Sequence, residues 1–86
     1  MKVKIYYKNS FLKKFKKLPI SIQQKVLKKE KIFIKDYFTP LLKTHKLHRR
    51  FKNFYTFSID FEYRIIFDFD QNKNIRFYSI GKHDIY

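Results

Sequence analysis

The chain has 86 residues, no cysteine, and 21 Lys and Arg against seven Asp and Glu, which gives a formal net charge of +14 at pH 7. The lack of cysteine excludes disulfide frameworks, thiolate zinc sites and cysteine nucleophiles. No apolar run approaches the roughly 20 residues of a membrane-spanning helix, and residues 1–10 contain no signal-peptide core. We therefore expect one cytoplasmic domain, residues 1–86, whose charge suits it to bind a polyanion such as RNA.

The positive charge is concentrated in the first part of the chain. Residues 1–50 contain 16 basic and two acidic residues, whereas residues 51–86 contain five of each. A codon bias toward lysine would raise the count everywhere, so it does not explain this asymmetry. Phosphate backbones bind such a surface through Coulomb attraction and counterion release. A membrane surface and an acidic protein stay open as alternative partners.

The first predicted elements are a strand and a helix. Alternating apolar residues predict a strand over residues 2–7. Asn9 or Ser10 can cap a helix that Pro19 ends. The apolar residues at helical spacing in this helix are Phe11, Leu12, Phe15 and Leu18.

A second helix is predicted to begin near Ile20 or Ser21 and to end before Pro40, and the two helices are expected to form an αα-hairpin. Its apolar stripe consists of Ile22, Val26, Phe33 and Tyr37, with Leu27 and Ile34 beside it. Residues 41–53 are very basic and show no clean period, so we expect a loop or an irregular segment there.

The last part of the chain alternates with a period of two, which predicts strands over residues 54–60, 63–69 and 75–80, joined by turns at 61–62 and 71–74. The face expected to meet the helices carries Tyr55, Phe57, Ile59, Tyr63, Ile65, Phe67, Ile75 and Phe77. The opposite face carries Thr56, Ser58, Glu62, Arg64, Asp68 and Arg76. The expected class is α+β: an N-terminal strand, the αα-hairpin and a three-stranded antiparallel meander, with the helices on one face of a four-stranded sheet and the polar face available to a ligand.

Few residues are candidates for chemistry. Arg64 lies in the apolar strand YRIIF and points away from the helices, where it either pairs with Glu62 or Asp68 or grips a phosphate. In the C-terminal GKHDIY, His83 could act as acid or base and Tyr86 could stack on a base.

A metal site is not expected. His45 and His48 form an HxxH pair, but no third ligand is evident and nearby cations would repel a metal ion, so we interpret both as exposed histidines of a basic segment. The sequence also contains no glycine-rich phosphate loop and no nucleophile elbow. The chemistry that fits is cofactor-free cleavage of RNA, in which the ribose 2′-OH is the nucleophile and the protein supplies a base, an acid and cations.

Four segments together resemble one family over nearly the whole chain. They are SFLKKFKKLP with a second helix after it, HKL before the sheet, YRIIFDF, and IGKHDIY at the end. In this order and spacing the chain resembles the RelE/ParE superfamily of type II toxin-antitoxin toxins, most of all its RelE and YafQ ribonuclease branch. The resemblance implies a RelE-like, microbial RNase-like fold and a toxin that cleaves mRNA in the ribosomal A site without a metal. It also implies a cognate antitoxin, expected to be acidic, in a toxin-antitoxin hetero-oligomer.

The resemblance also assigns the site residues. His45 matches a position where related toxins have a catalytic His or Glu, Arg64 the strand arginine that stabilises the phosphate, and His83 and Tyr86 the histidine and aromatic residue of the tail. We expect His45 or His83 to take the 2′-OH proton. Arg64 with Lys46 is expected to stabilise the negative charge of the phosphorane-like transition state. The residues expected to contact RNA are Lys43, Lys46, Arg49, Arg50, Lys52, Glu62 and Lys82.

Two alternatives stay open. Family members often carry a further arginine on the strand before YRIIF, and FYTFSID has none. A ParE-like toxin that binds DNA gyrase and an RNA-binding module without catalysis are therefore the competing hypotheses.

Overall fold

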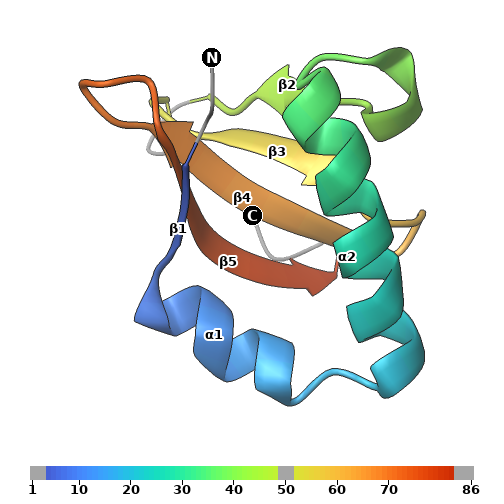
Figure 1. Cartoon of the computed structure of the whole chain (residues 1–86). Helices are drawn as coiled ribbons and strands as arrows, with labels where there is room; N and C mark the ends of the chain where they lie inside the picture. Colours follow the sequence, from blue (N-terminus) through green and yellow to red (C-terminus); the bar gives the residue numbers. More distant parts are fainter. Residues whose placement is uncertain (1–3, 49–51, 83–86) are drawn as a thin grey trace.

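The structure is a computed structural model that describes residues 4–48 and 52–82, and its described part forms a five-stranded sheet with two helices packed against it (Figure 1). In chain order the elements are β1 (Ile5–Tyr7), α1 (Asn9–Lys16), α2 (Ile20–Lys35), the 3-10 helix η1 (Pro40–Leu42), β2 (His45–Lys46), β3 (Tyr55–Ser58), β4 (Tyr63–Phe69) and β5 (Ile75–Lys82). The strand order is β1-β5-β4-β3-β2, with β1 parallel to β5 and all other neighbours antiparallel. The predicted α+β class is confirmed.

The sheet has one strand more than expected, because part of the predicted loop pairs with β3. His45 and Lys46 form β2 at the sheet edge, and η1 just before it buries Leu42 completely. A strand of two residues has no alternation that a sequence pattern could display. The prediction of an irregular segment over residues 41–53 was therefore wrong at β2 and η1.

Helix α1 begins without the predicted side-chain cap. Lys8 is at the N-cap position and no side chain bonds there. The hydroxyl of Ser10 instead donates to the backbone carbonyl of Tyr78 on β5. The polar side chain at the start of α1 therefore ties the helix to the sheet instead of capping it.

Helix α2 ends at Lys35, before Pro40 as predicted, but Tyr37, which was expected on its apolar stripe, lies beyond its end. Asp36 is extended, and its Oδ1 accepts the Phe38 N–H at 3.1 Å. Such an Asx turn offers the backbone an alternative to the next helical hydrogen bond, so the helix ends before Pro40 is reached. No helix within residues 4–48 and 52–82 is long and apolar enough to cross a membrane.

The two helices are joined tightly at residues 17–19. Gln23 on α2 donates from Nε2 to the Phe15 carbonyl at 3.0 Å and to the Leu18 carbonyl at 3.1 Å. The Phe15 carbonyl also accepts the Leu18 N–H at 3.1 Å, so Gln23 adds a second donor there and supplies a donor to the Leu18 carbonyl. From this junction α1 runs beside β5 while α2 rises past the other strands (Figure 1).

The core lies between the helices and the predicted apolar face, and it is built largely from rings. Phe33 of α2 is fully buried, and its ring centroid lies 4.4 Å from Phe57, 4.9 Å from Phe67 and 5.8 Å from Phe77. The inward positions of β3 and β4, and of β5 up to Phe77, carry rings or isoleucines at every second residue, as the alternation predicted. The face assignment is thus confirmed.

A β-bulge changes the alternation of β5. Ile66 pairs with Ser79 and Phe67 with Phe77, which leaves Tyr78 as an extra residue. After the bulge the even-numbered residues point inward, so Ile80 joins the core at 1% exposure. An unbroken period of two from Phe77 would put Ile80 on the opposite face, so Ile80 was not among the predicted inward residues.

Candidate functional site

Arg64 extends from β4 on the face away from the helices, as predicted. Its neighbours in register are Ser58 on β3 and Gly81 on β5. The guanidinium is half-buried, and its Nη1 donates to the Ser58 hydroxyl at 2.8 Å. This bond fixes the side chain against a rigid strand, and a fixed guanidinium is suited to bind a phosphate.

A pocket of about 220 Å³ lies beside Arg64. It opens at the end of β3 that β2 leaves uncovered, between η1, the turn after β3 and helix α2. The pocket is lined by Lys29, Leu41, Lys43, Ser58, Ile59, Asp60, Phe61 and Arg64. Its described lining therefore carries three cations and one carboxylate.

The single carboxylate of this pocket is kept charged by its partners. Burial acts to raise the pKa of Asp60, but the N–H groups of Tyr63 and Glu62 and the ammonium group of Lys25 outweigh it and hold the pKa below its ordinary value of 3.8. The Lys25 Nζ lies 3.2 Å from Asp60 Oδ2. Because Lys25 neutralises Asp60, the pocket stays net positive.

His45 lies on β2, on the same face of the sheet as Arg64. It pairs with Thr56, two residues along β3 from Ser58, so strand spacing puts the Cα atoms of His45 and Arg64 about 12 Å apart. The His45 Nδ1 lies 2.9 Å from the Lys43 carbonyl oxygen. A carbonyl can only accept, so Nδ1 carries the proton, and in the neutral ring Nε2 is left as the acceptor.

Lys46 is not among the described residues that line the pocket beside Arg64. It lines a second, polar pocket of about 380 Å³ with Asn53, Asp68 and Arg76. The residue beside Arg64 is Lys43. Of the two lysines, Lys43 therefore lines the pocket beside Arg64 and Lys46 lines the pocket around Asp68 and Arg76.

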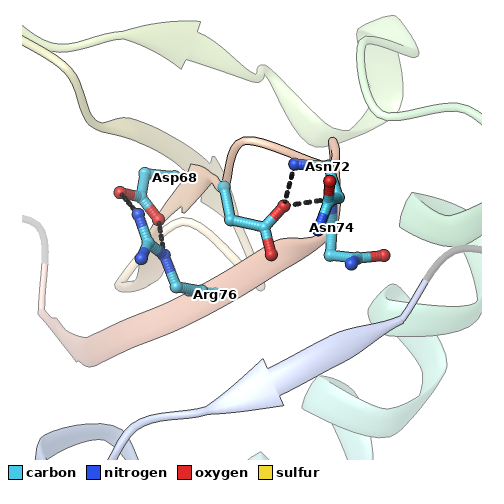
Figure 2. A network of polar contacts seen from close by, with 5 residues as sticks. Asp68, Asn72, Asn74 and Arg76 are labelled. Atoms are coloured by element: carbon cyan, nitrogen blue, oxygen red, sulfur yellow. Dashed lines mark hydrogen bonds and ion pairs between the residues drawn. The ribbon is translucent and has the colours of Figure 1, made fainter.

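Asp68, one of the two acidic residues considered as partners of Arg64, is bound by Arg76. The Arg76 Nε donates to Asp68 Oδ1 at 2.8 Å and its Nη2 to Asp68 Oδ2 at 2.7 Å (Figure 2). The hydrogen bonds with Asp68 raise the pKa of Arg76. Figure 2 also shows the neighbouring turn, in which one carboxylate oxygen of Asp70 accepts the N–H groups of Asn72 and Asn74.

The polar face of the sheet is less open than expected. Thr56 is fully buried, and Ser58, Ile66 and Asp68 are each 8% exposed. Small side chains at the centre of this face are covered by longer ones, as Ser58 is bound by Arg64. The openings described beside these buried side chains are the pocket next to Arg64 and the pocket around Asp68 and Arg76.

The remaining predicted residues lie apart from this pocket or outside the described part of the chain. Lys52, Glu62 and Lys82 are exposed, and the Lys82 Nζ lies 4.0 Å from Glu62 Oε2. The other predicted residues, Arg49, Arg50, His83 and Tyr86, lie outside the described residues. Within residues 4–48 and 52–82, no three His, Asp or Glu side chains are grouped as metal ligands would be.

Lys29 and Phe61 are among the pocket residues that were not predicted as site residues. Lys29 is one of many lysines on α2, and Phe61 was interpreted only as part of a turn. The sequence contains no signal for either, because it does not show which turn of α2 lies over the end of β3.

Comparisons with known proteins were made at the level of sequence and of structure. No protein-family model matches the chain, and no curated protein matches it. A YoeB/ParE toxin from Agrobacterium tumefaciens aligns with a TM-score of 0.77 at 13% identity, covering 94% of this chain and 99% of that one. YoeB of Staphylococcus aureus, solved as a dimer, aligns with a TM-score of 0.77 at 17% identity over 96% and 99% of the two chains.

An archaeal RelE–RelB complex from Pyrococcus horikoshii OT3 contains a chain that aligns over the full length of both chains, with a TM-score of 0.77 at 16% identity. At these identities the likeness concerns the fold. The chain therefore has the fold of the RelE and YoeB toxins of toxin-antitoxin pairs.

Proposed function

We propose that this chain is the toxin of a toxin-antitoxin pair and that it is a metal-independent endoribonuclease that cleaves mRNA on the ribosome. The fold it shares with YoeB and RelE proteins supports the first part. The second part depends on one observation: Arg64 and Lys43 line one pocket, and the backbone of that same lysine orients the ring of His45.

In the proposed reaction, His45 Nε2 takes the proton of the ribose 2′-OH at the cleavage site. The 2′-oxygen then forms a bond to phosphorus as the bond to the 5′-oxygen breaks. Arg64 and Lys43 stabilise the negative charge that builds up on the phosphoryl oxygens. His83 is the alternative base, and His83 or Tyr86 is the candidate acid for the leaving 5′-oxygen. The products are a 2′,3′-cyclic phosphate, which can open to a 3′-phosphate, and a 5′-hydroxyl end.

The test is to map mRNA 5′ ends on ribosomes after the chain is expressed. New 5′-hydroxyl ends and arrest of translation are expected for the wild type. Arg64→Ala should slow cleavage about 10²- to 10³-fold, the usual effect of removing one group that stabilises transition-state charge. Lys28→Ala, which removes an exposed lysine of α2 outside the pocket lining, is the matched control and should cleave normally.

Uninterrupted translation and intact mRNA in cells that make the wild type would contradict the ribonuclease. If the same cells lost DNA supercoiling, the gyrase-binding alternative would apply.

The proposed partner is an acidic antitoxin. The matched archaeal chain was solved in complex with RelB, and the net charge of +14 of this chain favours an acidic partner. The test is co-expression with the product of the neighbouring reading frame. Co-purification and relief of growth arrest are expected, and the lack of both would contradict this pairing.

A further inference from the structure

Phe61 is the most exposed of the large apolar side chains in the described part of the chain. Its side chain is 87% exposed, and Leu41 across the same pocket is 71% exposed. An exposed ring adds little to the stability of the fold, because it keeps nearly all of its area in contact with water. Its position at the rim of a cationic pocket suggests a role in binding.

The turn that carries Phe61 is held in one shape. Asp60 Oδ1 accepts the N–H groups of Glu62 at 2.9 Å and Tyr63 at 2.8 Å, and Lys25 of α2 donates to Asp60 Oδ2 at 3.2 Å. The Asp60 carboxylate thus forms hydrogen bonds within the turn and also connects the turn to α2. The Phe61 backbone is ordered before any ligand arrives, which lowers the entropy cost of binding.

Three cations from separate parts of the chain line the same pocket as Phe61. Lys29 comes from α2, Lys43 follows η1, and Arg64 comes from β4. An aromatic face beside several cations is the arrangement by which proteins bind single-stranded nucleic acid, because bases stack on the ring while the phosphates meet the charges.

We propose that the pocket is a subsite for single-stranded RNA in which a base stacks on Phe61 and Lys29 binds a phosphate of the same strand. The inference deepens the proposed function, since it assigns the RNA segment beside the phosphate held by Arg64 and Lys43. Phe61 and Lys29 are positioning residues and take no part in bond making.

The test measures binding of a 2′-O-methyl oligoadenylate by the whole chain. This probe has the bases and phosphates of RNA but no 2′-OH nucleophile, so binding is measured without cleavage. Phe61→Ala should weaken binding about tenfold, in the range found for loss of one base–aromatic stack. Phe61→Tyr should restore it, whereas Phe61→Leu should not. Ile20→Ala, at a side chain that is 70% exposed and outside the pocket lining, is the control and should bind like wild type.

The phosphate contact is tested by the salt dependence of the same binding. The slope of log K against log salt is negative. Lys29→Ala should reduce its magnitude by about 0.7, the value for one phosphate contact on a single strand. Lys28→Ala removes the same charge one residue away and should leave the slope unchanged.

A second probe, inorganic polyphosphate, separates stacking from charge. Phe61→Ala should bind polyphosphate as the wild type does, because this probe has no bases. Equal binding of the oligoadenylate by wild type and Phe61→Ala, or an equal loss for both probes, would overturn the subsite. If mRNA stays intact in cells while Phe61 still governs oligoadenylate binding, the ribonuclease proposal fails and the subsite stands.

Discussion

The two faces of the sheet are both largely covered, but by different kinds of side chain. Toward α2 the contacts are ring on ring, centred on Phe33. On the other face, small polar or acidic side chains are bound by arginines, Ser58 by Arg64 and Asp68 by Arg76. Ring packing is non-directional and fills volume, whereas a guanidinium has five donors and can bind a neighbour and a ligand together.

The two faces therefore contribute to stability and to ligand binding in different ways. Apolar area removed from water on the helix side supplies most of the stability. The arginine side holds charged groups at fixed positions near solvent, which a site for phosphate requires. Substitutions in the ring core should therefore lower the free energy of unfolding more than substitutions among the polar pairs of the other face.

The largest loss of stability is expected for Phe33→Ala. Removing the ring at the centre of the core should lower the free energy of unfolding by about 3–5 kcal/mol, because it leaves a cavity among three other rings. Urea unfolding gives the value. Ile34→Ala, at the next residue of α2 with 45% exposure, is the control and should cost much less. Similar midpoints for the two variants would contradict the assigned core.

A smaller loss is expected on the polar face for Asp68→Asn. This change removes the charge that two Arg76 N–H groups bind, and hydrogen bonds to charged groups contribute roughly 1.5–3 kcal/mol. We expect a loss of about 2 kcal/mol in urea unfolding. A double-mutant cycle with Arg76→Gln should show that most of the loss is shared by the pair, and additive losses would refute the coupling.

Asp60→Asn should lower stability by about 1 kcal/mol at neutral pH, because the charge that Lys25 and the turn N–H groups bind is lost. The pKa of Asp60 lies below its ordinary value of 3.8 in the folded chain. Its contribution is therefore complete above that ordinary value and is lost as the pH falls through the folded value. Unfolding measured from pH 7 to pH 2 should show the wild type and the variant converging at the acid end. A constant difference across the range would contradict the assigned hydrogen bonds.

The smallest effect is expected for Lys82→Gln. The Lys82 and Glu62 side chains are 63% and 55% exposed and 4.0 Å apart, and such surface pairs contribute little. The change in unfolding free energy should stay within about 0.5 kcal/mol, and a loss above 1 kcal/mol would show that this pair is structural after all.

Local patterns predicted much of the fold. The period of two identified the inward rings of β3 and β4, and it also set Arg64 on the opposite face. The sequence patterns did not predict the places where the alternation of a strand is interrupted or is too short to detect. The bulge at Tyr78 turned Ile80 inward, and β2 is too short to show any alternation.

The candidate site was predicted in part. Arg64 and His45 were identified as residues, with Lys46 as the expected partner of Arg64. In the structure, Lys43 and Lys29 line the pocket beside Arg64, while Lys46 lines the pocket around Asp68 and Arg76. The residue type alone does not show which of many lysines lines the pocket. Only their positions in the folded chain do.

The sequence by itself determined the excess of positive charge, its concentration in the first 50 residues, and the order of helices and strands. These follow from composition and from periods that extend over a few neighbouring residues. Only the tertiary structure decided which charges meet. Lys29, Lys43, Phe61 and Arg64 come from four separate segments, and the register of β2 and β3 and the position of α2 bring them to one pocket. The excess charge is thus a property of the whole chain, but a candidate site exists only where packing brings a few of these charges and an aromatic ring to one pocket.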